Sequence, residues 1–277
     1  MIHYSKLSEK EKKKSSHFFD NRMMDDVEHA TEQFISEKQK EISHLKEMEN
    51  FRKEFLGNVS HELKTPLTAI QGHILTLLDG GLEDETINRL YLQRTSFNIE
   101  RMLGIVNDLD TITQLESEAN SLEFEKFNIY HLLKEVIDIL EITAKNYNIK
   151  LLLDTNPERS YHVFADKDKI RRVLINLIEN SIKYNDKTNG ETHINIYDVD
   201  KNYLVEIADN GIGIDRKHFS RLFERFYRVD KNRSRTTGGS GLGLAIVKHI
   251  VDAHKQTLTV NSIVGEGSTF GFTLQKA

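Results

Sequence analysis

The stretch Ile74-Leu-Thr-Leu-Leu-Asp79-Gly80-Gly81-Leu-Glu83 decides the fold of the N-terminal half of the chain. Its two adjacent glycines permit the positive φ that ends a helix and turns the chain. Before it, residues 21–78 are rich in Glu, Lys, Gln and Leu, with apolar residues at helical spacing. After it, a second helical pattern covers residues 83–116. The sequence therefore predicts a helical hairpin over residues 51–117.

Each helix of this hairpin carries an apolar stripe. The first stripe consists of Leu45, Met48, Phe51, Phe55, Val59, Leu63, Leu67, Ile70, Ile74 and Leu77, and the second of Ile99, Met102, Leu103, Val106 and Leu109. Two helices cannot enclose a core, so we expect two chains to form an antiparallel four-helix bundle and the protein to be a homodimer. Residues 21–50 would enter the bundle as a parallel coiled coil, behind an N-terminal tail over residues 1–20.

The remainder, residues 119–277, alternates between strand and helix patterns. Strands are predicted over 121–127, 149–154, 192–199, 203–209, 257–262 and 269–274, and helices over 129–147, 167–184 and 241–253. Strands with helices on one side predict an α/β sandwich, and the whole chain is of the α+β class. The Arg-rich segment 215–240 is expected to be a mobile lid, fastened by Phe219, Leu222, Phe223 and Phe226.

Composition excludes several classes of protein. The 277 residues suffice for about two domains, and no apolar run reaches the length of about 18 residues that a membrane span needs. The net charge of −5, from 38 basic and 43 acidic residues, does not call for nucleic acid as a partner. The chain has no cysteine, which suits a reducing cytoplasm, and its 12 histidines lack the spacing of a zinc site.

The segment Ser60-His61-Glu62-Leu63-Lys64-Thr65-Pro66 lies inside the first predicted helix. Val59 and Leu63 each stand about 200° around the helix from His61, so His61 faces water if they face the core. An exposed imidazole can accept a phosphoryl group, and the Glu62 carboxylate can accept the ring proton. Pro66 should kink or loosen the helix there. By itself, a surface histidine is usually inert.

Three further clusters could bind a nucleotide. Asn176 and Asn180 share a helical face with Lys183 and Tyr184 close behind, and amide oxygens suit Mg²⁺. Asp209-Asn210-Gly211-Ile212-Gly213 follows a strand and could present a carboxylate to an adenine amino group. Gly238-Gly239-Ser240-Gly241-Leu242-Gly243-Leu244 opens a helix, where backbone N–H groups favour an anion. Each alone has an ordinary alternative: solvated amides, a hairpin turn or a glycine-rich loop.

Cationic side chains stand between the glycine clusters. Any of Arg225, Arg228, Lys231, Arg233 and Arg235 could neutralise charge on a transferred phosphoryl group, although most of them would serve as solvated surface.

From residue 45 to the C-terminus the sequence resembles the sensor histidine kinases of two-component systems. Five blocks occur in the family's order: His61–Pro66 resembles the phosphoacceptor box, Asn176–Tyr184 the N box, Asp209–Gly213 the first glycine box, Phe223–Tyr227 the F box and Gly239–Leu244 the second glycine box. Gly265–Phe270 resembles the closing glycine turn. Residues 49–55 also resemble the phosphate-sensing subgroup.

The resemblance implies a function for each block. His61 would be the phosphoacceptor, Glu62 the acid/base, and Thr65 the residue that orients water when the response regulator is dephosphorylated. The resemblance further implies an ATP site of the gyrase and chaperone type with Asn180 as the Mg²⁺ ligand and Asp209 as the adenine contact. Its other expected nucleotide contacts are Asn176, Lys183, Tyr184, Gly211, Gly213, Arg228, Gly239, Gly241, Leu242, Gly243 and Thr269.

The partners implied are a second copy of the chain and the receiver domain of a separate response regulator. The family usually begins with membrane helices and a sensing domain, so we expect either the cytoplasmic part of an inner-membrane sensor or a naturally soluble kinase. Two alternative functions remain compatible with the sequence. One is an ATPase of the gyrase or chaperone type in which His61 has no catalytic role, and the other is a non-enzymatic dimeric scaffold.

Overall fold

The computed structural model describes residues 9–117, 122–229 and 239–277. The chain divides into two compact units, residues 1–59 and 60–277. The long helix α1 (Glu9–Thr76) runs through both units, and it begins earlier than the predicted start near residue 21. In the first unit, the apolar residues Phe34, Ile42, Leu45 and Met48 are exposed along this helix. No helix in the described part of the chain has the length and apolar character to cross a bilayer.

The helical hairpin begins the second unit. Helix α1 continues without interruption through Pro66, whose imino ring removes one backbone donor but does not break the helix. A short π-helical turn, η1 (Leu77–Gly81), follows, and Gly80 takes the predicted positive φ of 90°. Helix α2 (Asn88–Ser117) starts five residues later than predicted. The delay arises because Asp84 accepts hydrogen bonds from the Thr86 backbone and hydroxyl, which hold residues 84–86 in a turn.

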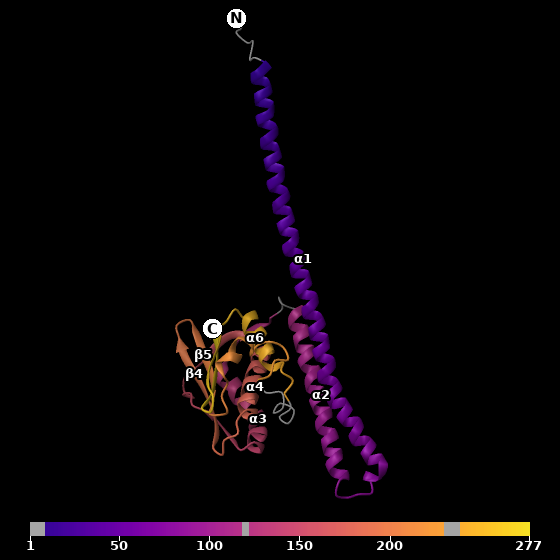
Figure 1. Cartoon of the computed structure of the whole chain (residues 1–277). Helices are drawn as coiled ribbons and strands as arrows, with labels where there is room; N and C mark the ends of the chain where they lie inside the picture. The colour runs from indigo at the N-terminus through magenta and orange to yellow at the C-terminus, as the bar shows by residue number, and fades with distance from the viewer. Residues whose placement is uncertain (1–8, 118–121, 230–238) are drawn as a thin grey trace. The chain divides into compact units, whose positions relative to one another are not determined.

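The predicted α/β sandwich follows the hairpin (Figure 1). Its helices are α3 (Ile129–Asn146), α4 (Lys167–Lys183) and α6 (Gly243–Ala253), and a 3-10 helix, η2 (Arg216–Arg221), lies in the segment predicted as a lid. Its main sheet has the order β2-β4-β5-β7-β6, in which β2 and β4 run parallel and the other pairs antiparallel. These strands are β2 (Ile149–Leu153), β4 (Gly190–Val199), β5 (Asn202–Asp209), β6 (Leu258–Ile263) and β7 (Gly267–Gln275).

A second sheet of two strands was not fully predicted. Strand β1 (Phe124–Asn128) corresponds to an expected strand, but its antiparallel partner β3 (His162–Asp166) was missed. Tertiary contacts fix β3 in place: Val163 bridges to Lys276, and the Asp166 amide donates to His254 at 3.1 Å.

The core lies between the helices and the main sheet, and Figure 1 shows α3, α4 and α6 together on one side of β4 and β5. Amphipathic spacing explains why: the apolar residues of α4 are buried on one face, which leaves its polar residues on the other. Ile112 of α2 joins the same core. The polar face of α4 borders the functional site.

Candidate nucleotide and phosphoacceptor site

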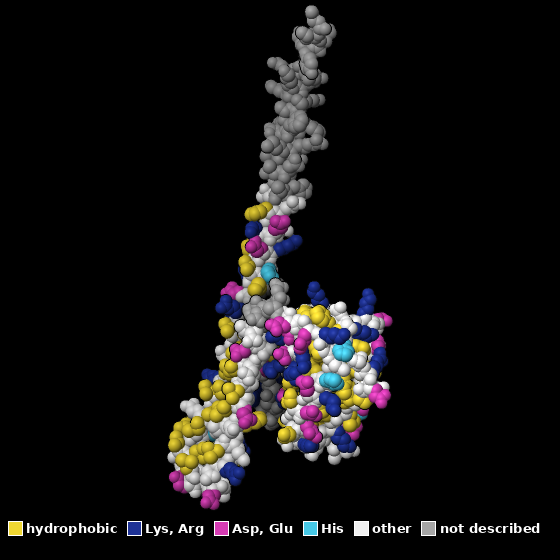
Figure 2. Space-filling model, turned by 180° about the vertical axis from the view of Figure 1, so that it is seen from behind, with side chains coloured by type: hydrophobic (Ala, Val, Ile, Leu, Met, Phe, Trp, Pro, Cys, Tyr) yellow, Lys and Arg dark blue, Asp and Glu magenta, His cyan; other side chains and the backbone are white. Residues whose placement is uncertain are grey.

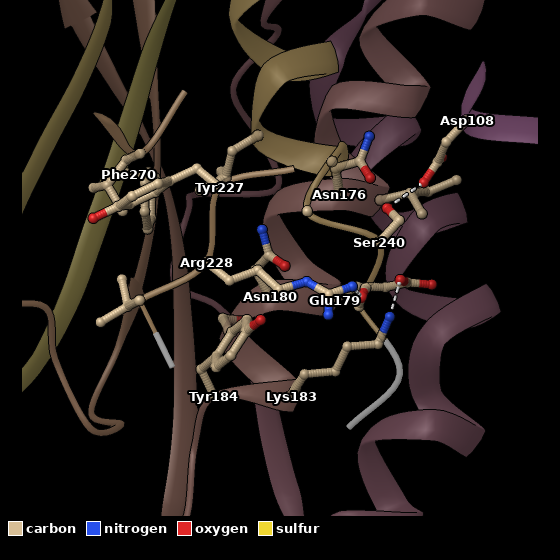
Figure 3. A pocket seen from close by; sticks show the side chains of 18 of the residues that line it. Asp108, Asn176, Glu179, Asn180, Lys183, Tyr184, Tyr227, Arg228, Ser240 and Phe270 are labelled. Atoms are coloured by element: carbon tan, nitrogen blue, oxygen red, sulfur yellow. Dashed lines mark hydrogen bonds and ion pairs between the residues drawn. The ribbon is translucent and has the colours of Figure 1, made fainter. Parts of the chain in front are cut away.

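A cavity of about 570 Å³ opens on the polar face of α4. This volume lies within the range of about 300–1,000 Å³ that is usual for small-molecule sites. Of the residues predicted for a nucleotide site, the cavity brings together Asn176, Asn180, Lys183, Tyr184, Asp209, Gly213, Arg228, Gly239, Gly241 and Gly243. Figure 3 shows the labelled side chains of α4 lying side by side along it.

Helix α4 supplies the amide groups of the cavity. Its N-cap, Asp166, accepts from the Lys169 amide at 3.0 Å and so fixes where the helix begins. The buried Nδ2 atom of Asn176 has no hydrogen-bond partner among the described residues, so this amide suits a ligand. Lys183 is paired with Glu179 at 2.6 Å. The donor set of amide oxygens fits Mg²⁺ held jointly with phosphates and water, and Asn180 would hold it.

Asp209 ends β5 and lies half-buried along the cavity. Its Oδ1 atom accepts from the backbone N–H groups of Gly211 at 2.8 Å and of Ser268 at 3.3 Å. Burial raises the pKa of the Asp209 carboxyl from 3.8 to about 6, against the lowering effect of these two hydrogen bonds. Gly211 does not line the cavity; it is needed because a Cβ there would lie 2.5 Å from the Tyr184 carbonyl oxygen. A desolvated carboxylate in this position can accept a hydrogen bond from a ligand.

The second glycine cluster forms the loop that opens α6. Gly241 has a φ of +75°, and its carbonyl accepts from the Phe226 amide at 2.9 Å, so the loop is tied to the lid segment. A Cβ on Gly243 would lie 2.9 Å from the Asn176 amide oxygen, which explains why the loop can approach α4 closely. Leu242 is fully buried in the core and anchors the loop instead of lining the cavity. Arg228 donates to the Gly239 carbonyl.

His61 is exposed on α1, as its helical phase predicts, while Val59 and Leu63 are half-buried. The Thr65 hydroxyl donates to the His61 carbonyl at 3.2 Å. The neighbouring Glu62 carboxylate accepts from Arg228 at 3.0 Å and from Arg101 of α2 at 3.4 Å. His61 and Thr65 do not line the cavity, but Glu62 is linked to it through Arg228.

Comparison with known proteins identifies two domains in the chain. Residues 51–118 match the His Kinase A (phospho-acceptor) domain, and residues 165–277 match the histidine kinase-, DNA gyrase B- and HSP90-like ATPase family. Sensor histidine kinase WalK of Bacillus subtilis is 37% identical over 235 residues, which are 84% of this chain and 38% of that protein. The chain belongs to the sensor histidine kinase family. It spans well under half the length of this relative.

Solved structures agree with this membership. The Acinetobacter baumannii histidine kinase AdeS is 29% identical with a TM-score of 0.62, over 78% of this chain and 97% of AdeS. The histidine kinase ThkA, in complex with the response regulator protein TrrA, is 26% identical with a TM-score of 0.58, over 81% of this chain and 61% of that one. The resemblance of residues 49–55 to the phosphate-sensing subgroup stays a prediction.

The sequence patterns did not indicate every residue of the cavity. Thr269 was predicted, but the structure places its neighbours Ser268 and Phe270 along the cavity, because alternate residues of β7 point to opposite faces. Other residues of the predicted boxes also line the cavity, namely Glu179, Ser181, Ile212, Tyr227, Ser240 and Leu244, as does Leu222 of the predicted lid. The lining residues outside these predictions are Glu100, Arg101, Gly104, Ile105, Asn107, Asp108, Arg172, Ile175, Ile214 and Val229. Of the candidate lid cations, Arg225 does not line the cavity, and Lys231, Arg233 and Arg235 lie outside the described residues, as does Gly238.

Proposed function

We propose that this chain is the catalytic core of a homodimeric protein-histidine kinase that uses Mg·ATP to phosphorylate His61. The single observation that carries the proposal is the combination of two features in one chain. One is an exposed histidine followed by a carboxylate that is ion-paired to Arg228. The other is a cavity that contains both the desolvated carboxylate of Asp209 and the amides of Asn176 and Asn180.

The reaction follows from the chemistry of these groups. The adenine amino group would donate to Asp209, and the phosphates would lie along Asn180, Lys183 and the glycine loop. Mg²⁺ held by Asn180 would neutralise part of the phosphate charge. A ring nitrogen of His61 then attacks the γ-phosphorus, the bond to the bridging oxygen of ADP breaks, and Glu62 accepts the proton of the ring. Asn176, Tyr184, Gly211, Gly213, Arg228, Gly239, Gly241 and Gly243 would bind or shape the site, while Leu242 and Thr269 would support it indirectly.

The phosphoryl group would pass to an aspartate in the receiver domain of a separate response regulator, in the cytoplasm. The structure of ThkA with a response regulator supports this choice of partner. We also propose a phosphatase activity, in which the Thr65 oxygen accepts a hydrogen bond from the attacking water. Its hydroxyl proton is already donated to the His61 carbonyl, so the oxygen lone pairs remain for that purpose.

The homodimer is supported by the surface of the hairpin. Leu67, Ile74, Leu75, Leu78, Leu90, Leu92, Phe97, Ile99, Leu103 and Val106 are all exposed. Figure 2 shows hydrophobic side chains gathered on the hairpin. Such a continuous apolar surface is typical of an interface, and a second hairpin would bury it.

Incubation with ATP labelled at the γ-phosphate tests the proposal. We expect label on the protein that is stable in alkali and labile in acid, and we expect His61→Gln to lose at least about 99% of it. His131→Gln, which removes an exposed histidine from α3 of the ATP-binding domain, is the matched control and should label normally. Free phosphate without labelled protein would instead support the ATPase, and neither product would support the scaffold. Normal labelling of the His61 variant would refute the assignment.

A further inference from the structure

Asp108 of α2 reaches the ATP-binding domain at the cavity. Its Oδ1 atom accepts from an Nη atom of Arg172 on α4 at 2.5 Å. Its Oδ2 atom accepts from the Ser240 hydroxyl at 2.8 Å (Figure 3). The Asp108 side chain is only 15% exposed. A carboxylate therefore bridges α4 and the glycine loop, which are the two elements expected to hold phosphates.

Arg172 continues the functional face of α4 by one turn. It precedes Asn176 by four residues, as Asn176 precedes Asn180, so the three side chains share a face, and all three line the cavity. The Nε atom of Arg172 is buried without a hydrogen-bond partner among the described residues. The neighbouring Arg171 points elsewhere and pairs with Glu135 at 2.8 Å. Arg172 therefore lines the cavity with one guanidinium donor still unpaired, whereas Arg171 does not line the cavity.

The donors around Asp108 are those that a phosphate group would use. A guanidinium, a hydroxyl and the N-terminal loop of a helix together form a good site for an oxyanion. The same pattern occurs beside it, where the Glu62 carboxylate is bound by Arg228. In both places an acidic side chain of the hairpin binds a cation that lines the cavity of the ATP-binding domain.

We propose that Arg172 is a further phosphate-binding residue of the nucleotide site, and that Asp108 of the hairpin competes with the nucleotide for it. This inference rests on the proposed function, since it assumes that the cavity binds ATP. Binding of phosphate to Arg172 releases Asp108, and with it one polar contact between α2 and the ATP-binding domain. Because the two contacts exclude each other, a change that weakens the hold of Asp108 on Arg172 strengthens nucleotide binding.

The first experiment compares two adjacent arginines. Equilibrium affinities for ATP and for adenosine are measured with the whole chain and with Arg172→Gln, Arg172→Lys and Arg171→Gln. We expect Arg172→Gln to weaken ATP binding about tenfold with little effect on adenosine, because only ATP has the phosphates. Arg172→Lys should recover part of the loss, and Arg171→Gln should behave like the parent chain. Thermal melting of each variant confirms that it is folded.

The second experiment tests the competition. Asp108→Asn removes the competing charge and should tighten ATP binding about three- to tenfold, without changing adenosine binding. Asp110→Asn, at an exposed position two residues along α2, is the matched control and should have no effect. In a double variant with Arg172→Gln, the gain from Asp108→Asn should disappear, because both residues act through one contact.

Several outcomes would overturn the inference. Unchanged ATP affinity in Arg172→Gln, or an equal loss for ATP and adenosine, would show that Arg172 does not bind phosphate. Unchanged or weaker ATP binding in Asp108→Asn would show that Asp108 does not compete with the nucleotide for Arg172. In each of these cases ATP still binds the parent chain, so the proposed kinase function stands. Failure of the parent chain to bind ATP would instead refute both.

Discussion

Leu78 and Leu103 of the hairpin are 70% and 57% exposed, whereas Leu132 and Ile178 of the ATP-binding domain are completely buried. Glycines differ in the same way. A Cβ added to Gly72 of the hairpin would meet nothing within 4 Å, but one added to Gly213 would lie 2.0 Å from the Ile263 carbonyl oxygen. The ATP-binding domain is thus a close-packed fold within a single chain. The hairpin has an apolar face that one chain cannot cover.

The largest expected effect is on folding stability, and it comes from comparing one glycine in each of the two regions. Gly213→Ala should destabilise the ATP-binding domain by about 3–5 kcal/mol, because the new methyl group collides with backbone and φ is +68°. Gly72→Ala, in the open interior of α1, should stabilise the helix by about 0.5–1 kcal/mol. Urea-induced unfolding measures both changes. Equal and small effects would show that the two regions are packed alike.

The next effect concerns association. Leu103→Gln should weaken the homodimer at least about a hundredfold, because each Leu buried between two chains contributes about 1.5–3 kcal/mol and the dimer loses two. Ile142→Gln, at an exposed position of α3 in the ATP-binding domain, is the matched control. Sedimentation equilibrium gives the dissociation constants. If Ile142→Gln weakens the dimer as much as Leu103→Gln does, the hairpin is not the interface.

The smallest effect concerns the buried charge of the nucleotide site. The pKa of Asp209 is raised to about 6 by burial, so the folded protein binds more protons than the unfolded chain between about pH 4 and 6. Folding stability from this group is therefore present at low pH and is lost as the pH rises through about 6. Asp209→Asn removes the buried charge and should raise stability at pH 7 by about 1–3 kcal/mol.

The same substitution should weaken ATP binding about ten- to hundredfold, because the amide presents a donor or a weaker acceptor to the adenine amino group. Thermal melting across pH 4–8 and equilibrium nucleotide binding check the two expectations together. Destabilisation at pH 7 by Asp209→Asn would show that the carboxylate supports the fold instead of a ligand. His61→Gln, by contrast, alters an exposed side chain and should change stability by less than about 0.5 kcal/mol.

Local patterns explain which predictions succeeded. The boundaries of α3 and α4 were predicted to within one residue, because strong amphipathic spacing and the N-caps Asn128 and Asp166 are written in consecutive residues. The turn at Gly80 and the exposure of His61 were also predicted, because each depends on residues that are close together in the sequence. Strand β3 was missed because a five-residue strand is fixed by its pairing with β1 and by His254, which comes 88 residues after Asp166.

Helix α2 shows most clearly what a sequence pattern cannot predict. Of its predicted apolar face, Ile99, Leu103 and Val106 are exposed, whereas Met102 is half-buried and Leu109 packs against the core of the ATP-binding domain. A second face with Arg101, Ile105, Asp108 and Ile112 packs toward the ATP-binding domain and was not predicted. Both faces have helical spacing, and spacing alone does not say which partner each face will meet.

The sequence by itself determined the family, the two kinds of domain and the motif residues, because each of these depends on side chains that are neighbours along one helix or one turn. The tertiary structure decided that Ser268 and Phe270 line the cavity in place of Thr269, that Arg228 binds Glu62, and that Asp108 reaches Arg172. The physical reason is that strand register and the docking of helices bring together residues that are far apart in the chain. No local pattern encodes those pairings.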